Sequence, residues 1–251
     1  LRLGSFQEDD VRVGGFFGAE ALNELYAFDV VFSIAALDAP SVLGMLGHDA
    51  CLRLPYPGGS RLVLGIAAAI EIIEPRPEAF VARLEIVPRM WTLGRTRGSR
   101  VYQNMTTEAI VKEVLTRHGI PHRFALKNQY PEHEYCLQYD ESDLDFVLRL
   151  LAEEGFAFTF EHWDEIEAKG AGFTRATECL MVADDPVLYT NVPKVPPAFL
   201  YKPDASQASW AVEPIMRLVQ RSAIATNKVT LRDFDFERAS PVASVPNPSP
   251  P

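Results

Sequence analysis

Residues 26–34 read Tyr-Ala-Phe-Asp-Val-Val-Phe-Ser-Ile, and every second position is apolar. A period of two residues is typical of a β-strand, because successive side chains of a strand point to opposite faces of the sheet. The residues that would share the buried face are Tyr26, Phe28, Val30, Phe32 and Ile34. This is the clearest strand in the sequence, and it predicts a sheet with one face packed on a core.

Further stretches extend the β pattern on both sides of this strand. Residues 51–54 and 61–64 flank a turn-rich segment, Pro-Tyr-Pro-Gly-Gly-Ser at 55–60, which predicts a hairpin with a longer loop. Gly65 follows and suggests a bulge or a sharp bend. Residues 80–87 alternate in the same way as the first strand. Successive antiparallel strands joined by turns favour a small barrel or a sandwich.

The apolar residues change to a helical period between Thr106 and Gly155. Thr106 can cap a first helix, and Gly119 can end it. A second helix begins at Ser142, in a capping-box pattern that has Asp145 in place of the preferred Glu, and ends at Gly155. Because its apolar positions almost encircle it, we expect this helix to be largely buried.

The C-terminal third alternates between short strands and proline-rich stretches. Residues 156–160 and 179–182 predict two strands, whereas the prolines between 184 and 214 exclude long regular elements. Residues 229–236 predict one last strand, and the prolines of 241–251 indicate a linker or a disordered tail.

These elements predict an α+β fold. We expect an antiparallel β-barrel built from residues 1–100 and completed within about 190–240, by the strand at 229–236. A helix-containing α/β insertion, residues 101–189, would interrupt the barrel, and residues 241–251 would form the tail.

Composition limits the classes of partner. The 251 residues carry 24 Lys and Arg against 34 Asp and Glu, a formal net charge of −10. Nonspecific nucleic-acid binding needs an excess of basic side chains to displace counterions, so no nucleic-acid partner is expected. The longest apolar stretch, residues 62–70, is about half the length of a membrane-spanning helix. We therefore expect no membrane insertion by this region, and we find no secretory signal.

The residues that could carry chemistry have simpler structural interpretations. His118 and His122 have the spacing of some zinc ligands, but Gly119 and Pro121 break the helix that would align them. They are interpreted as loop histidines. No metal site, cofactor site or catalytic residue is assigned, and binding residues are not identified.

The three cysteines, Cys51, Cys136 and Cys179, are an odd number at wide spacing and are expected to be reduced and buried. Cys136 lies near His133 in an acidic segment, which disfavours a thiolate nucleophile. The acidic pairs at 153–154 and 184–185 are expected to be solvated surface. The glycines of 14–18 lack the Lys-Ser/Thr of a phosphate-binding loop and are interpreted as turns.

The segment at residues 137–160 reads Leu-Gln-Tyr-Asp-Glu-Ser-Asp-Leu-Asp-Phe-Val-Leu-Arg-Leu-Leu-Ala-Glu-Glu-Gly-Phe-Ala-Phe-Thr-Phe. It resembles the QY-x-ES-D-x-x-F-x-x-R-L-x-EEG signature of VgrG proteins, the spike proteins of type VI secretion systems. Residues 43–47, 87–93, 101–106 and 229–236 resemble other segments of that family in the same order. Together these segments cover most of residues 1–240.

This resemblance implies a fold like the central hub of contractile phage tails. The implied role is mechanical and not enzymatic: a homotrimer of the full-length protein would adapt the hexameric tube protein, Hcp, to a trimeric needle. Baseplate components would be further partners, and effectors or adaptors would bind through C-terminal parts. Such a protein would assemble in the cytoplasm and then be secreted by the contractile apparatus without a signal peptide. The chain departs from the family in having only one barrel's worth of strands.

The signature residues also have structural interpretations. Ser142 and Asp145 would cap the second helix and Gly155 would end it, while Arg149 is placed to pair with Glu153 at the i,i+4 spacing. Two alternatives stay open. One is a tail hub of a phage or phage-like contractile particle. The other is a hydrolase that uses an acidic residue pair, which predicts a cleft that gathers carboxylates from distant segments.

Overall fold

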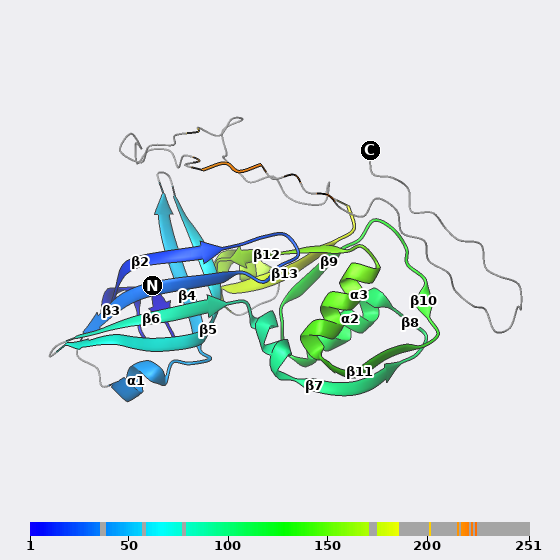
Figure 1. Cartoon of the computed structure of the whole chain (residues 1–251), viewed down its shortest axis with the longest axis horizontal. Coiled ribbons are helices and arrows are strands. Elements are labelled where there is room, and N and C mark those ends of the chain that lie inside the picture. Colours follow the sequence, from blue (N-terminus) through cyan, green and yellow to red (C-terminus); the bar gives the residue numbers. More distant parts are fainter. Residues whose placement is uncertain are drawn as a thin grey trace, which may run out of the picture. The chain divides into compact units, whose positions relative to one another are not determined.

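The computed structural model describes residues 1–35, 39–56, 59–76, 79–170, 175–185, 201, 215, 217–220, 222 and 224 (Figure 1). The chain divides by its contacts into residues 1–194 and residues 195–251. In the second unit, Tyr201 and Ile215 form a parallel bridge. The strand expected at 229–236 and the tail at 241–251 lie outside the described residues. The helices and named strands of the described residues all belong to the first unit.

Six strands form an antiparallel sheet in the order β1-β4-β5-β6-β3-β2. Their bounds are β1 Arg2–Leu3, β2 Val11–Ala19, β3 Ala27–Ala35, β4 Asp49–Tyr56, β5 Gly59–Arg76 and β6 Ala79–Val87. A 3₁₀ turn, Glu8–Asp10, precedes β2, and a short helix, α1 (Ala39–Leu43), follows β3. The alternation predicted for residues 26–34 is confirmed, because Tyr26, Phe28, Val30, Phe32 and Ile34 are all buried.

The sheet is curled and open in the described part of the chain (Figure 1). Its edges are β1 and β2, and these two strands do not pair with each other there. The structure therefore shows a curled antiparallel sheet where a closed barrel was expected. The strand that was expected to complete the barrel, at residues 229–236, is not among the residues described.

The hairpin predicted around residues 55–60 is confirmed, but its loop is shorter than expected. β4 and β5 stay paired as far as Tyr56 and Gly59, so only residues 57 and 58 separate the strands. The glycines of 14–18, expected in turns, instead lie within β2, which has a bulge between Val13 and Gly15. A bulge accommodates the extra residue without ending the strand.

Of the bulge or sharp bend predicted at Gly65, the bulge is not found there. Gly65 pairs in regular register with Ala50, and the irregularities of β5 lie further on, at Ala67/Ala69 and Ile72/Glu74. The glycine is needed for close approach: a Cβ atom there would lie 2.3 Å from the carbonyl oxygen of Val87. A side chain of any size would therefore push β5 away from the end of β6.

The remaining elements surround a second core. They are the 3₁₀ helix η2 Arg89–Arg95, β7 Arg97–Tyr102, β8 Met105–Thr106, α2 Thr107–Arg117, β9 His122–Ala125, β10 Glu132–His133, β11 Cys136–Ser142, α3 Asp143–Glu153, β12 Ala157–Trp163, α4 Glu165–Gly170 and β13 Thr177–Ala183. β12, β13 and β9 form one sheet, while β7 pairs with β11 and β8 pairs with β10. Met90 and Leu93 of η2 are part of this second core. The partly buried Phe160 packs against both cores. None of the described helices is long and apolar enough to cross a membrane.

Both predicted helices are confirmed. The Thr106 hydroxyl accepts a hydrogen bond from the amide of Ala109, and Gly119 has a positive φ of 64° after α2. Ser142 caps α3 by accepting from the amide of Asp145, and Gly155 follows α3 with a φ of 72°. The carboxylate of Asp145 accepts from the Ser142 hydroxyl at 2.7 Å. Figure 1 shows α2 and α3 together beside the β7–β11 ribbon.

Asp143, at the start of α3, is fully buried and links four segments. Its carboxylate accepts hydrogen bonds from Thr96 at 3.0 Å, Arg100 at 3.0 Å and Gln138 at 2.7 Å, and lies 2.7 Å from Nε2 of His118. Burial alone would raise the pKa of Asp143, but the hydrogen bonds from Gln138, His118 and Thr96 and the charge of Arg100 outweigh burial and lower it. The ionised carboxylate therefore stabilises this part of the fold.

Arg149 makes the predicted pair with Glu153 on the outer face of the same helix, at 3.1 Å. It also pairs with Glu141 at 2.6 Å and donates to the carbonyl of Leu137 at 3.2 Å. Arg149 thus joins α3 to β11, in addition to its contact within the helix.

Replacing Asp143 should destabilise the chain strongly at neutral pH. We expect Asp143→Ala to lower the free energy of unfolding by about 3–5 kcal/mol, because it leaves buried donors without an acceptor. Asp145→Ala, in the same helical turn but exposed, should cost about 1 kcal/mol or less. Urea unfolding at pH 7 measures both, and equal effects would contradict the role given to Asp143.

The contribution of Asp143 should also depend on pH in a defined direction. Because its pKa is lower in the folded chain, the stabilisation is fully present above the unfolded pKa, about 3.9, and is lost as pH falls through the folded value. The difference between wild type and Asp143→Ala should therefore shrink when unfolding is measured at progressively lower pH below about 4. A constant difference across that window would contradict the lowered pKa.

Replacing Gly65 tests the close approach of β5 to β6. Gly65→Ala should destabilise the chain by about 1–3 kcal/mol, because the added methyl group meets backbone and not a movable side chain. Gly15→Ala is the matched control, since a Cβ there has no atom within 4 Å, and it should change stability by no more than about 0.5 kcal/mol. Thermal and urea unfolding of the two variants provide the comparison.

Candidate functional site

The histidines with zinc-like spacing lie in different structural contexts. His118 follows α2 and contacts Asp143, whereas the Nδ1 atom of His122, in β9, lies 2.8 Å from the carbonyl oxygen of Ile120. Among the described residues, no group of three or more His, Cys, Asp or Glu side chains is placed to hold a metal ion. Each imidazole instead contacts a neighbouring protein acceptor.

The three cysteines are free and buried, as predicted. Burial raises the pKa of the Cys51, Cys136 and Cys179 thiols, that of Cys179 to about 12. The nearby His133 is engaged elsewhere, because its Nε2 atom lies 2.8 Å from the hydroxyl of Thr107. Thiols with raised pKa values and no adjacent base are poor nucleophiles.

The acidic pairs have defined structural partners. Glu154 accepts from the Thr107 hydroxyl at 2.7 Å, and Asp185 pairs with Lys127 at 2.9 Å. Asp184 accepts from the amides of Lys127 and Asn128, each at 2.9 Å, and so fixes the loop after β9. These carboxylates stabilise local structure. The sequence had suggested only that they are solvated at the surface.

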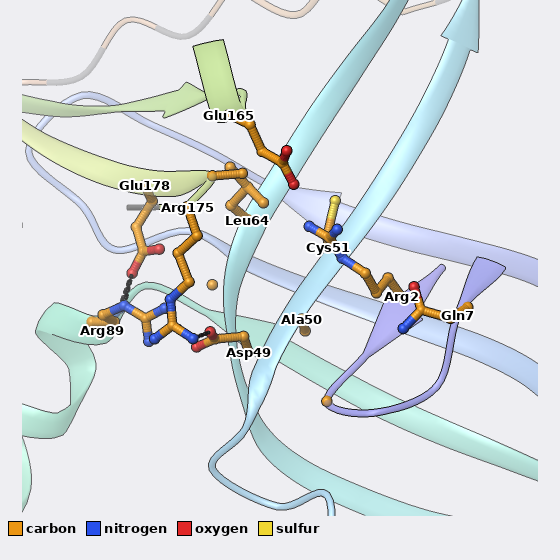
Figure 2. Close-up of a pocket in the computed structure, with 13 residues that line it drawn as sticks. Arg2, Gln7, Asp49, Ala50, Cys51, Leu64, Arg89, Glu165, Arg175 and Glu178 are labelled. Atoms are coloured by element: carbon orange, nitrogen blue, oxygen red, sulfur yellow. Dashed lines mark hydrogen bonds and ion pairs between the residues drawn. The ribbon is translucent and has the colours of Figure 1, made fainter. Parts of the chain in front are cut away.

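A cavity of about 260 Å³ lies where the curled sheet meets β13 (Figure 2). It is lined by residues of β1, β4, β5, η2, α4 and β13, together with the segment just after β1 and the segment just before β13. Its charged residues are three carboxylates and three guanidiniums: Asp49, Glu165, Glu178, Arg2, Arg89 and Arg175. Sequence reasoning missed this cavity, because its walls come from segments more than a hundred residues apart.

The carboxylates of the cavity are not arranged as an acid–base pair. Asp49 accepts from Arg89 through one oxygen and pairs with Arg175 through the other, each at 2.6 Å. One oxygen of Glu178 accepts from the amide of Arg89 at 2.9 Å. Because an arginine side chain only donates hydrogen bonds, both oxygens of Asp49 act as acceptors. Asp49 of β4 is thereby linked to Arg89 of η2 and to Arg175 in the segment before β13. The geometry therefore gives little support to the hydrolase alternative.

An exposed apolar surface lies along the edge strand β2. Val13 and Phe16 pair with Phe32 and Val30, so they share the buried face of the sheet, yet they are 39% and 51% exposed. Phe17 is on the opposite face and is 74% exposed. β2 contains neither Lys nor Pro, and its protection as an edge strand is limited to Arg12 and the bulge between Val13 and Gly15. This β2 edge surface, defined as Val13, Phe16 and Phe17, is a candidate contact surface.

A second apolar surface lies on the β7–β11 ribbon. Tyr135, Leu137 and Tyr139 occur at alternate positions, and Val101 is the cross-strand partner of Leu137. All four are exposed. Neither surface could be located from the sequence, because alternation shows which residues share a face but does not show which faces stay uncovered.

Comparison with known proteins places the chain in a family. Residues 19–251 match the family model described as phage tail baseplate hub (GPD). The type VI secretion system spike protein VgrG4b of Pseudomonas aeruginosa is 33% identical over 91% of this chain and 26% of its own length. VgrG5 of the same organism is 30% identical over 95% of this chain and 28% of its own length. The chain thus spans about a quarter of the length of these relatives.

A solved structure supports the same assignment. The E. coli c3393 protein, described as a component of the type VI secretion system with structural similarity to T4 bacteriophage tail proteins gp27 and gp5, aligns with a TM-score of 0.61. It is 27% identical, and the alignment covers 78% of this chain and 53% of that one. The resemblance to VgrG spike proteins is confirmed. The chain belongs to the phage tail baseplate hub family, with VgrG spike proteins of type VI secretion systems among its relatives.

Proposed function

We propose that this chain forms the hub portion of a VgrG-type spike, which adapts the hexameric Hcp tube to a trimeric needle for effector delivery. The observation that carries this proposal is the similarity to VgrG spike proteins along nine-tenths of the chain, together with the hub-like fold. The role is structural and not enzymatic. The protein would assemble in the cytoplasm and leave the cell with the contractile apparatus. Baseplate components would be neighbours, and effectors or adaptors would bind through parts beyond this region.

The exposed inner face of β2 supports closure of the barrel by residues 229–236. Val13 and Phe16 belong to the core face but lack a covering neighbour among the described residues. Residues 229–236 read Val-Thr-Leu-Arg-Asp-Phe-Asp-Phe and have strand-like composition at about the length of β2. A strand placed beside β2 would cover these two side chains and pair the open edge.

Phe17 supports association with a neighbouring subunit. Its side chain points to the outer face of the sheet, so closure of the barrel would leave it exposed. Burying a phenylalanine side chain contributes about 1.5–3 kcal/mol, so Phe17 would strengthen a contact between subunits that covers it. We assign the outer side of β2, around Phe17, to the subunit contact of the trimer.

The family model is that of a phage tail baseplate hub, so a hub in a phage-like contractile particle is the second candidate. Both machines join a hub to a tube, and they differ in the tube protein that the hub binds. Binding to Hcp favours the secretion spike, whereas binding to a phage-type tube protein encoded beside the gene favours the second candidate.

Hydrogen–deuterium exchange tests closure of the barrel. In the full chain, the β2 amides on the edge away from β3 should exchange slowly, because residues 229–236 would bond them. In a chain that ends at residue 224, those amides should exchange rapidly, while amides of the β7–β11 ribbon keep their rates. Identical β2 exchange in the two chains would contradict closure by this segment.

Light-scattering mass after size exclusion tests the hub function. The longest product of the gene should be a trimer that co-elutes with purified Hcp. Phe17→Ser should weaken assembly roughly tenfold to 150-fold for each contact that loses the phenylalanine. Tyr139→Ser is the matched control, because Tyr139 is also 74% exposed but lies on the ribbon, and it should leave the trimer intact. A monomer that ignores Hcp would overturn the proposal.

A further inference from the structure

A histidine between two sheets accepts a hydrogen bond that it cannot keep once it is protonated. The side chain of His162, in β12, is 7% exposed, and its Nδ1 atom accepts from the main-chain amide of Leu64, in β5, at 3.1 Å. Because a main-chain amide only donates, Nδ1 carries no proton, and the neutral ring holds its single proton on Nε2. A proton added at Nδ1 would place two donors against each other. Protonation of Nδ1 and the bond to Leu64 therefore exclude each other.

Two other histidines show the contrast. The ring of His118 contacts the carboxylate of Asp143, and the ring of His122 contacts the carbonyl oxygen of Ile120, so in both cases the partner is an acceptor. A protonated imidazole donates from both of its nitrogens, so protonation preserves these two contacts. Of these three histidines, only His162 loses a hydrogen bond when its ring becomes fully protonated.

The charged groups that face His162 favour the protonated ring. Glu20, which follows β2, lies 3.8 Å from Nε2 and pairs with Arg61 of β5. Glu178 is the direct cross-strand partner of His162 on β13, and it pairs with Arg89 of η2. The Nε2 atom has no hydrogen-bond partner among the described residues. Because a carboxylate this close stabilises a positive imidazole, the ring has a favourable charged neighbour when it leaves the Leu64 amide.

Tyr26 is the remaining titratable group that packs on the ring. Its ring lies edge-on to that of His162, with 5.2 Å between the centroids, and its hydroxyl donates to the Leu64 carbonyl. Burial raises the pKa of Tyr26 well above its usual value, so this hydroxyl keeps its proton at neutral and acidic pH. Acid therefore affects the amide side of Leu64 and leaves the carbonyl side bonded.

We propose that His162 is an acid-sensitive switch at the joint between the six-stranded sheet and the β12–β13–β9 sheet. At neutral pH, Nδ1 accepts from the Leu64 amide and links β12 to β5. At lower pH, Nδ1 takes up a proton, the bond to Leu64 breaks, and the two sheets are held together less firmly. The switch is distinct from the barrel closure and the subunit contact proposed above, because neither involves His162 or Leu64.

The direction and size of the effect follow from linkage. Only the released ring can bind a proton at Nδ1, so release of the Leu64 amide must become more favourable as the pH falls. An accessible imidazole has a pKa of about 6.5. Release that takes up one proton should become about tenfold more favourable for each pH unit below this value, and it should not depend on pH well above it.

Amide hydrogen exchange, followed by NMR on the 251-residue chain, tests the switch. After correction for the intrinsic pH dependence of exchange, protection of the Leu64 amide should be constant well above about pH 6.5 and fall about tenfold per pH unit below it, down to about pH 5. The amide of Leu115, in α2 and fully buried in the second core, should keep its protection. An equal loss at Leu115 would show global unfolding and would contradict a local switch.

One variant separates the acceptor from its titration. In His162→Asn, the side-chain carbonyl can take the place of Nδ1 as acceptor, and it binds no proton in this pH range. Protection of Leu64 in this variant should be independent of pH. His122→Asn is the matched control and should keep the wild-type pH dependence, because its ring contacts an acceptor.

The ¹⁵N signals of the histidine rings in the wild-type chain give a second measurement that needs no variant. At neutral pH, Nδ1 of His162 should be unprotonated, and its proton uptake should coincide with the loss of protection at Leu64. A proton on Nδ1 at neutral pH would overturn the proposal. Constant protection of Leu64 down to about pH 5, or a pH dependence that persists in folded His162→Asn, would also overturn it.

Discussion

The six-stranded sheet and the β12–β13–β9 sheet are joined at the main chain of Leu64. β5 extends beyond the end of β6. On the side that faces β6, Leu64 therefore has no strand partner among the described residues. The Tyr26 hydroxyl donates to the Leu64 carbonyl, and the Leu64 amide donates to Nδ1 of His162 at 3.1 Å. Burial raises the pKa of Tyr26 well above its usual value, so the hydroxyl stays a donor. Because His162 belongs to β12, these bonds hold the second sheet against the first.

Other features of the structure follow from this joint. Gly65, the next residue, must lack a side chain, because a Cβ there would lie 2.3 Å from the Val87 carbonyl and 3.1 Å from the Tyr26 hydroxyl. The same contact brings Glu178 of β13 to Arg89, so the cavity forms beside it with charged walls from both sheets. Phe160 lies edge-on to Tyr26 at the boundary of the two cores. The fold thus combines a rigid junction with an open edge at β2.

Local patterns in the sequence predicted the local elements well. The alternation of residues 26–34 and the caps at Thr106 and Ser142 depend on neighbours within a few positions, and each was found where expected. Nothing in the sequence indicated the role of Asp143, because its contact with Thr96 spans 47 residues and no local pattern encodes it. The close approach at Gly65 and the cavity were missed for the same reason. Their roles depend on which segments meet, and this is decided by tertiary packing.

The proposed hub role depends on apolar surfaces of the chain. The candidate nucleophiles, histidines and acidic pairs are engaged in structural contacts, whereas the edge strand β2 leaves apolar side chains uncovered. Electron cryomicroscopy of the longest gene product mixed with Hcp tests the hub role most directly. The account predicts particles in which three copies cap one end of a six-fold tube, with the outer sides of β2, around Phe17, at the subunit contacts. Single copies that never meet the tube would contradict it.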